Sequence, residues 1–262
     1  MKVSIVMPTF NQLSYTKLCL ESLLKNTWDI EHEIIAVDNA STDGTAEFLK
    51  QSGIFCLLNR ENLGVAKAWN QGIKASRGRY ICIINNDIIT GAGWLSCLIG
   101  AYESIANAGI VSPGTRWGDL NYDFDRYSAE YVKRMKGVTQ EGYAGWCMLI
   151  ERTRFAKAGY FSEDYDIGTG EDTDFYNALN KAGFRSFITG CAFVHHFGSR
   201  TLKEVRKKNK GFEEENLGKL RDKWGIKEDT YIQRKTKSLK KFIRNTYFKA
   251  VHGHTLDERR PK

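Results

Sequence analysis

Strand-like and helix-like segments alternate along the first 90 residues, and this alternation limits the possible fold more than any other feature. Short apolar runs rich in β-branched residues alternate with longer segments whose apolar residues recur at helical spacing. The sequence predicts strands at 2–8, 32–39, 54–60 and 79–87, and helices at 14–27, 41–52 and 62–76, the second helix capped by Ser41 or Thr42. Repeated β-then-α units predict an α/β fold whose mostly parallel central sheet is flanked by helices on both faces.

Length and charge predict one main domain followed by a basic extension. A chain of 262 residues with 42% hydrophobic and 12% aromatic residues can bury one large core, which we expect within residues 1–202. From residue 203 onward, 19 Lys and Arg stand against 9 Asp and Glu, whereas the first 202 residues hold 20 against 22. The excess positive charge therefore lies in residues 203–262, which we expect to be helical.

The hydropathy pattern predicts an intracellular protein, and the cysteine pattern predicts free thiols. No apolar run approaches the ~18 residues that a membrane-spanning helix requires, and Met1–Ile5 leads directly into a strand instead of a signal peptide. The six cysteines lie far apart with no CxxC pair, so we expect buried free thiols and not zinc ligands. The expected location is cytoplasmic.

Polar residues follow each predicted strand. These strand ends are 8–11, 38–41, 59–62 and 85–87. In an open parallel sheet, ligands bind beyond the carboxyl ends of the strands, although a single polar residue there often only caps a turn. Asp38 could accept a hydrogen bond from a base or ribose, and Asp87 could bind a divalent cation. Because GxGxxG and P-loop motifs are absent, a dinucleotide site is disfavoured, and a metal on Asp87 would neutralise phosphate instead.

A second polar group lies in "GTGEDTDFYNALNKAGF". Glu171, Asp172 and Asp174 precede apolar residues at helical spacing, so the three carboxylates are predicted at the N-terminus of a helix. Acidic residues there also complement the helix dipole, and this structural interpretation suits Asp174 best. Glu171 and Asp172 remain candidates for acid–base chemistry.

The segment "AFVHHFGSRT" places two adjacent histidines on a predicted strand. Because neighbouring side chains of a strand point to opposite faces, either His195 or His196 could face a site while the other packs in the core. Arg200, just beyond, would supply charge complementary to phosphate. Upstream lies a dense aromatic set, including Trp146, that is mostly core.

Four ordered blocks together resemble the inverting family 2 glycosyltransferases with the GT-A fold. They are "VSIVMPTFNQ", "IIAVDNASTDGT", "NRENLGVAKAWNQGIKASRGRYICIINNDI" and "GYFSEDYDIGTGEDTDFYNALNKAGF". The resemblance covers about residues 1–202 and implies a Rossmann-like GT-A domain. Its first half, 1–100, would bind a UDP-, dTDP- or GDP-linked sugar, and its second half, 101–202, a glycan or lipid-linked acceptor. The implied reaction is metal-assisted transfer of a hexosyl group with inversion.

The resemblance also implies roles for individual residues. Donor-binding positions would be Thr9, Phe10, Asn11, Asp38, Asn62, Lys67, Asn85 and Asn86. Asn85-Asn86-Asp87 matches the family's DxD position, but Asn85 replaces the first aspartate and leaves a single charged ligand for Mn²⁺ or Mg²⁺. One of His195 and His196 would complete the metal shell. Asp172 would be the general base, Glu171 would orient the acceptor or share the proton, and Trp146 would lie beneath the acceptor.

Two questions stay open from the sequence. In the extension, Leu239, Phe242, Ile243, Tyr247 and Val251 recur at helical spacing among Lys and Arg residues. This pattern predicts either an ordinary surface helix or one that contacts an anionic membrane, and nucleic acid is not an expected partner. The alternative to an enzyme is a non-catalytic nucleotide-sugar or glycan-binding module tethered by this basic tail. A sugar-phosphate nucleotidyltransferase is disfavoured because "PTFNQLSY" lacks a glycine-rich basic loop.

Overall fold

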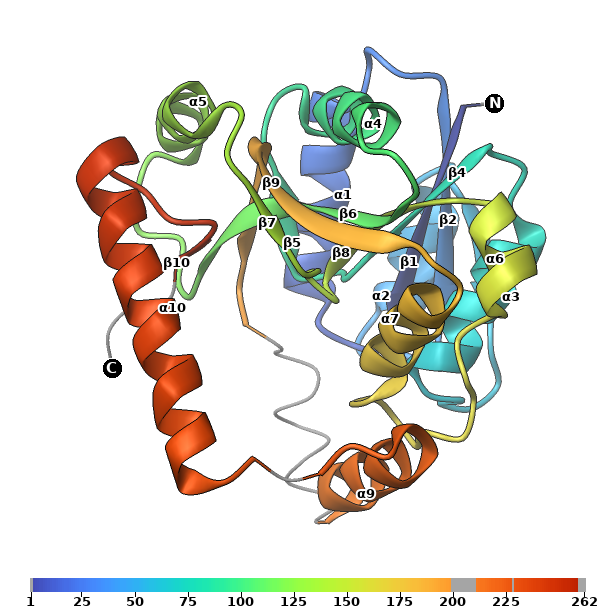
Figure 1. The fold of residues 1–262 in the computed structure, drawn as a ribbon. Coiled ribbons are helices and arrows are strands. Elements are labelled where there is room, and N and C mark those ends of the chain that lie inside the picture. Colours follow the sequence, from blue (N-terminus) through green and yellow to red (C-terminus); the bar gives the residue numbers. More distant parts are fainter. Residues whose placement is uncertain (1, 199–210, 228, 259–262) are drawn as a thin grey trace.

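One mixed β-sheet runs through the molecule, with helices on both faces (Figure 1). The structure is a computed structural model that describes residues 2–198, 211–227 and 229–258. The described strands are β1 Val3–Thr9, β2 His32–Asp38, β3 Phe55–Leu58, β4 Tyr80–Ile84, β5 Ile88–Thr90, β6 Ala108–Trp117, β7 Thr139–Glu141, β8 Cys147–Glu151, β9 Arg185–His196 and β10 Asp257–Glu258. The described helices are α1 Leu13–Asn26, α2 Thr45–Gln51, α3 Val65–Ala75, α4 Trp94–Ser104, α5 Phe124–Met135, α6 Thr153–Ala158, α7 Glu171–Lys181, α9 Phe212–Trp224 and α10 Tyr231–His252.

The first half of the sheet is parallel, as the β-then-α pattern predicts. Strands β3, β2, β1 and β4 lie side by side in that order and run in the same direction. Alternation along β1 sends Val3, Ile5 and Met7 into a core beneath α1 and α4, and Val6 into a second core beneath α3, α6 and α7. The carboxyl ends of β1, β2 and β4 consequently open on one edge.

The second half of the sheet is mixed and sets the position of the histidines. The order continues β8, β6, β9 and β5, and β8 is antiparallel to both of its neighbours. Strand β5 runs antiparallel to β9 with Ile88 opposite His196 and Ile89 opposite His195. This register brings the end of β9 next to the turn between β4 and β5.

The start of the second predicted helix differs from the sequence prediction. Helix α2 begins at Thr45 after Gly44, whose φ of 92° is left-handed, and neither Ser41 nor Thr42 caps it. Ser41 instead donates its hydroxyl to Asp38 Oδ1 at 2.5 Å and its backbone N–H to Asp38 Oδ2 at 2.9 Å. The residues before α2 form a tight turn on Asp38, in which the Ser41 side chain is engaged with this carboxylate instead of a helix N–H.

The predicted extension supplies α9, α10 and β10. Strand β10 pairs in parallel with β6, and Leu256 before it is buried with Tyr131 and Phe193. Figure 1 shows α10 along one side of the molecule with its C-terminal end beside α5. No helix in the described part of the chain is long and apolar enough to cross a lipid bilayer. All six cysteines are free, but the prediction of buried thiols holds only for Cys19, Cys82 and Cys147, because Cys56, Cys97 and Cys191 are partly exposed.

Candidate functional site

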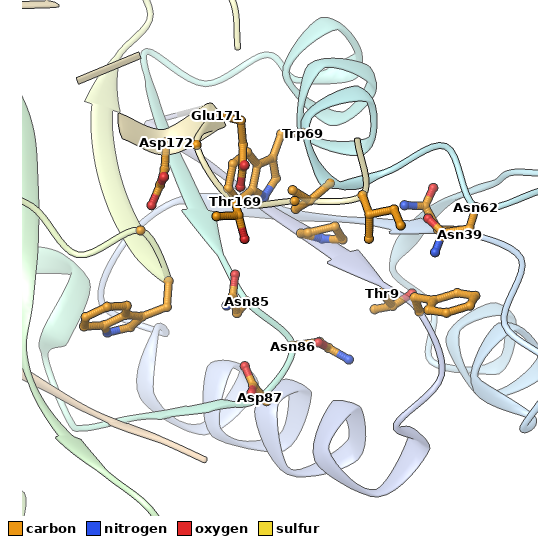
Figure 2. A pocket seen from close by; sticks show the side chains of 18 of the residues that line it. Thr9, Asn39, Asn62, Trp69, Asn85, Asn86, Asp87, Thr169, Glu171 and Asp172 are labelled. Carbon is orange, nitrogen blue, oxygen red and sulfur yellow. The ribbon is translucent and has the colours of Figure 1, made fainter. Parts of the chain in front are cut away.

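A cavity of about 320 Å³ opens at the carboxyl ends of β1, β2 and β4, within the usual size range of small-molecule sites. Its lining residues come from both halves of the sheet and from α9: Pro8, Thr9, Phe10, Asn39, Asn62, Val65, Trp69, Asn85, Asn86, Asp87, Gly145, Trp146, Ile167, Gly168, Thr169, Gly170, Glu171, Asp172, Thr173, His196 and Leu217. Figure 2 shows Asp87 on one side of this cavity and the Glu171–Asp172 pair on the other, with Asn85 between them.

Asp87 and His196 form a buried carboxylate–imidazole pair in the cavity wall. His196 Nε2 lies 3.0 Å from Asp87 Oδ1, and His196 is 1% exposed and Asp87 3% exposed. The β5–β9 register holds the pair in place, and Phe197 donates its backbone N–H to the Asp87 carbonyl at 3.0 Å. His196 Nδ1 is buried without a hydrogen-bond partner.

His195 faces away from this cavity. Its Nδ1 lies 2.9 Å from the Tyr122 hydroxyl, its ring packs edge-on against Phe197, and it does not line the cavity. Burial is the main reason that the pKa of His195 falls to about 4. Of the two histidines proposed from the sequence as metal ligands, His196 is therefore the one that faces the cavity, and His195 does not.

The Asp87–His196 pair could hold a divalent cation with help from a substrate. Among the described residues, no group of three or more His, Cys, Asp or Glu side chains is placed to bind a metal ion. A carboxylate and an imidazole are nevertheless suitable ligands for Mn²⁺, and divalent cations often complete their shell with substrate phosphates and water. The donor set thus fits a cation that binds together with a phosphate-bearing ligand.

Glu171 and Asp172 begin α7 on the opposite side of the cavity. Glu171 is 5% exposed, and its Oε2 is buried without a partner. Asp172 Oδ1 accepts a hydrogen bond from the Thr173 backbone N–H at 2.7 Å. Its Oδ2 lies so close to Gly145 that a Cβ built there would sit 2.2 Å away. The Asp172 carboxylate therefore has its observed position only because residue 145 is a glycine.

Burial shifts the titration of both carboxyl groups. Desolvation, reinforced by the negative charge of Asp172, raises the pKa of Glu171 to about 8. Desolvation also raises the pKa of Asp172, although the Thr173 N–H opposes this shift. With a pKa of about 8, Glu171 is mostly protonated in neutral solution, so its carboxyl group can donate a hydrogen bond.

Glu171 makes the stability of the fold depend on pH. Its folded pKa lies above the unfolded value, so its stabilising contribution is complete below pH 4.5 and is lost as pH rises through about 8. We expect Glu171→Gln to raise the free energy of unfolding by roughly 1–3 kcal/mol near pH 8 and to change it little near pH 4. Urea unfolding at both pH values measures this. Glu61→Gln, an exposed control, should show no such pH-dependent gain.

The loop before α7 is held at residues 166–168 by hydrogen bonds from two helices. Val65 at the start of α3 donates its N–H to the Ile167 carbonyl at 3.0 Å. From α9, the buried Asn216 side chain donates to the carbonyls of Asp166 and Gly168 at 2.9 and 3.1 Å. Ile167 has a φ of 64°, a strained conformation for a β-branched residue. Helices α3 and α9 together hold this loop in the cavity wall.

Asp174 does not reach the cavity and serves a different purpose. Its two carboxylate oxygens accept hydrogen bonds from Lys223 Nζ at 2.9 Å and Trp224 Nε1 at 2.6 Å, both on α9. Asp174 is 4% exposed, whereas the Lys223 side chain is 46% exposed, so only the acidic partner of this ion pair is shielded from water. Asp174 thus attaches α9 to α7, an arrangement that adds to the dipole effect expected from the sequence.

Some of the predicted donor-binding residues line the cavity near the carboxyl ends of β1 and β4, but others do not line it. Thr9, Phe10 and Asn62 line it, together with Asn85 and Asn86. Asp38 is 1% exposed and does not line it, because its oxygens accept hydrogen bonds from Thr9 and Ser41. The neighbouring Asn39 faces the cavity instead.

Lys67 and Asn11, two further predicted donor-binding residues, do not line this cavity. Lys67 is exposed on α3, while its neighbours Ala68 and Trp69 point inward. Asn11 has a left-handed φ of 55° and its side chain accepts the Thr42 N–H at 2.8 Å, away from the main cavity. Arg200 lies outside the described residues.

Trp146 lines the cavity with its indole N–H already bonded. Its Nε1 donates to Thr115 Oγ1 at 2.9 Å, and its ring stacks on the imidazole of His196 at 5.3 Å between centroids. Trp146 therefore lies between the Asp87–His196 pair, which it contacts through its ring, and its neighbour Gly145, which lies close to Asp172. A ring in this position can contact the apolar face of a ligand but cannot donate another hydrogen bond from its nitrogen.

Trp69 and Leu217 are cavity residues that sequence reasoning missed. Trp69 belongs to the apolar face of α3 and looks like an ordinary core residue, yet its Nε1 is buried without a partner. This buried N–H group without a partner can be recognised only in the folded structure. Leu217 comes from α9, and no pattern in the sequence links this helix to the cavity.

Three curated relatives align with most of this chain, but the alignments include only part of each relative's own length. Over 187 residues, the chain is 27% identical to the uncharacterized glycosyltransferase YfnE of Bacillus subtilis, covering 69% of this chain and 46% of that protein. It is 34% identical to the uncharacterized glycosyltransferase EpsJ of the same species, covering 78% and 63%. A third relative, from Methanococcus voltae, is named dolichyl N-acetyl-alpha-D-glucosaminyl phosphate 3-beta-D-2,3-diacetamido-2,3-dideoxy-beta-D-glucuronosyltransferase and is 26% identical, covering 78% and 70%. The chain thus spans about half the length of YfnE.

Solved structures share the fold at low sequence identity. TarS (residues 1–349) of S. aureus has a TM-score of 0.57 at 18% identity, covering 79% of this chain and 64% of that one. The mannosyltransferase PcManGT of Pyrobaculum calidifontis, solved with GDP-Man and Mn²⁺, has a TM-score of 0.56 at 21% identity, covering 78% and 59%. These likenesses confirm the predicted GT-A fold. The profile of glycosyl transferase family 2 matches residues 4–164, more than half of the sequence, and so the chain belongs to that family.

Proposed function

We propose that this chain transfers a sugar from a nucleoside-diphosphate sugar to a hydroxyl group of a glycan or lipid-linked acceptor, with inversion at the anomeric carbon. One observation carries the proposal. A single cavity contains a carboxylate–imidazole pair on one side and a carboxyl pair with raised pKa values on the other. The first suits a metal-bound diphosphate, and the second suits removal of a proton from an attacking hydroxyl.

In the proposed reaction, the acceptor oxygen forms a bond to the anomeric carbon as the bond from that carbon to the diphosphate breaks. The nucleoside diphosphate leaves with the electron pair, and Asp172 takes the proton of the hydroxyl. Asp172 Oδ1 is already engaged by the Thr173 N–H, which leaves Oδ2, beside Gly145, as the oxygen that accepts this proton. Protonated Glu171 orients the acceptor by a hydrogen bond from its otherwise unpartnered carboxyl group.

The leaving diphosphate would be bound at the other side of the cavity. Asp87 and His196 would hold a divalent cation there, and the cation would stabilise the negative charge that develops on the leaving group. Asn85 and Asn86 add amide groups near the same position, but no second carboxylate. We therefore infer that Mn²⁺ or Mg²⁺ binds weakly alone and more tightly with the nucleotide.

The names of similar proteins support the two substrate classes. PcManGT was solved with GDP-Man and Mn²⁺, and GalNAc-T7 with UDP, GalNAc and Mn²⁺. The Methanococcus voltae relative is named for a dolichyl sugar-phosphate acceptor. For this chain, both a nucleotide-sugar donor and a lipid-linked or glycan acceptor remain proposals.

The test is an assay of donor consumption with purified protein. UDP-, GDP- and dTDP-sugars are each incubated with Mn²⁺ or Mg²⁺, with and without glycan and lipid-phosphate acceptors. Released nucleotide is measured, and the anomeric configuration of the product is read by NMR. We expect metal-dependent release with one nucleotide and an inverted linkage. Nucleotide binding without hydrolysis or transfer would favour the non-catalytic module, and a retained configuration would contradict Asp172 as a simple base.

A further inference from the structure

Helix α10 packs against the rest of the protein along only one of its sides. Its partly buried positions within the described side chains of Ile232–His252 are Arg244, Asn245, Phe248 and His252. Phe248 packs on the cluster around Tyr131, and His252 Nδ1 lies 3.0 Å from the Arg134 carbonyl of α5. Residues 232–243 are exposed all around the helix. Figure 1 accordingly shows the N-terminal part of α10 extending away from the sheet.

Helix α10 carries an unusual concentration of exposed apolar side chains. Six of the 15 large hydrophobic side chains that are exposed in the described part of the chain belong to this helix. They are 55–75% exposed: Ile232, Leu239, Phe242, Ile243, Tyr247 and Val251. We call the surface formed by Ile232, Leu239, Ile243 and Tyr247 the outer face of α10, and Phe242 and Val251 lie beside it. Isolated exposed hydrophobic residues are common, but a continuous stripe indicates a binding surface.

Helix geometry places the outer face away from the protein. At about 100° per residue, Ile232, Leu239, Ile243 and Tyr247 cluster around one direction, roughly 160° from the centre of the buried positions 244, 245, 248 and 252. Within the described part of the chain, the outer face is therefore left in water. The stripe cannot be the core-facing side of an ordinary surface helix, because that side is already occupied by Phe248 and its neighbours.

The charge of α10 identifies the kind of surface that would cover the outer face. Residues 231–252 include seven Lys or Arg and no Asp or Glu. Lys237 and Lys241 pair with Asp229 and Asp257, each by its Nζ. Lys240 and Lys249, at about 100° per residue, flank the apolar stripe on its two sides. Basic residues beside an apolar stripe are complementary to a surface with an apolar interior and anionic groups at its boundary with water.

We propose that the outer face of α10 binds an anionic phospholipid bilayer, with the helix lying in the plane of the headgroups. Its apolar side chains would enter the boundary between headgroups and acyl chains, while the long Lys side chains reach the anionic phosphates. A second copy of the chain fits less well, because an isologous contact would bring two rows of Lys and Arg together. This proposal does not depend on the proposed sugar transfer.

Vesicle co-sedimentation tests the proposal. The full chain is mixed with phosphatidylcholine vesicles, or with vesicles that also contain about 30% phosphatidylglycerol, at low and high salt. We expect at least about tenfold tighter binding to the anionic vesicles, weakened by salt. Leu239→Ser with Ile243→Ser should weaken that binding by about tenfold or more, because two apolar side chains no longer enter the bilayer. Circular dichroism checks that the variants keep their helix content.

Matched charge variants distinguish binding through the outer face from a general effect of the protein's net charge. Lys240→Glu with Lys249→Glu should reduce binding strongly, whereas Lys50→Glu with Lys157→Glu, the same charge change on α2 and α6, should reduce it much less. Equal losses in the two pairs, or binding unaffected by the serine substitutions, would overturn the proposal. A different result would also overturn it: light scattering finds that the parent protein is a dimer, the Leu239→Ser, Ile243→Ser variant is a monomer, and the parent protein does not bind vesicles.

Discussion

Asp172→Asn is expected to lower kcat for sugar transfer by about 10²- to 10⁴-fold, the usual contribution of a positioned general base. Asparagine has the same shape and can still accept the Thr173 N–H, which now reaches Asp172 Oδ1 at 2.7 Å. It cannot take a proton from the acceptor hydroxyl. Because Asp172 lies across the cavity from Asp87, the dissociation constant of the nucleoside diphosphate should stay nearly unchanged (Figure 2). Steady-state kinetics and calorimetric titration measure the two quantities separately.

Asp174→Asn provides the matched control, two residues along the same helix. It removes the negative charge that pairs with Lys223, so it should lower the free energy of unfolding by about 1–3 kcal/mol. Because Asp174 does not line the cavity, kcat should change only a few-fold below the melting temperature. The assignment of the base is wrong if Asp172→Asn keeps near-normal turnover, or if both substitutions reduce kcat to the same extent.

Asp87→Ala is expected to abolish the metal-dependent part of nucleotide binding. If the proposed site exists, the matching nucleoside diphosphate with Mn²⁺ at about 100 times its Kd should stabilise the parent protein by about 2.7 kcal/mol. For a chain of this size that is a rise in Tm of roughly 5–10 °C. In the variant, Mn²⁺ should add nothing to the shift that the nucleotide gives alone. Differential scanning calorimetry with each component separately and together measures this coupling.

The adjacent histidines provide an internal control for the metal site. His196→Asn should also lose the Mn²⁺-dependent shift, because His196 Nε2 lies 3.0 Å from Asp87 Oδ1 and faces the cavity. His195→Asn should keep it, since His195 packs against Tyr122 and Phe197 on the other side of the strand. A Mn²⁺ effect that persists in both Asp87→Ala and His196→Asn would show that the cation, if it binds, is held elsewhere.

Local sequence patterns predict much of the first half of the fold. Alternating apolar residues and helical spacing predict strands and helices within a few residues of β1–β4 and α1–α3, because these patterns depend on neighbours along the chain. The same locality explains why Asp87 follows a buried strand and why Glu171, Asp172 and Asp174 occupy the first turn of α7. Helix caps were less predictable, since the turn at Ser41 depends on the Asp38 carboxylate.

By itself, the sequence thus determined which chemical groups are available and on which local elements they lie. Tertiary structure alone decided which of them face one another. The β5–β9 register selects His196 over His195, buried hydrogen bonds turn Asp38 away from the cavity, and docking of α9 brings Leu217 and Asn216 to the loop before α7. The reason is physical. Periodicity fixes the direction of a side chain relative to its own strand or helix, whereas strand register and helix docking depend on contacts between residues far apart in the chain.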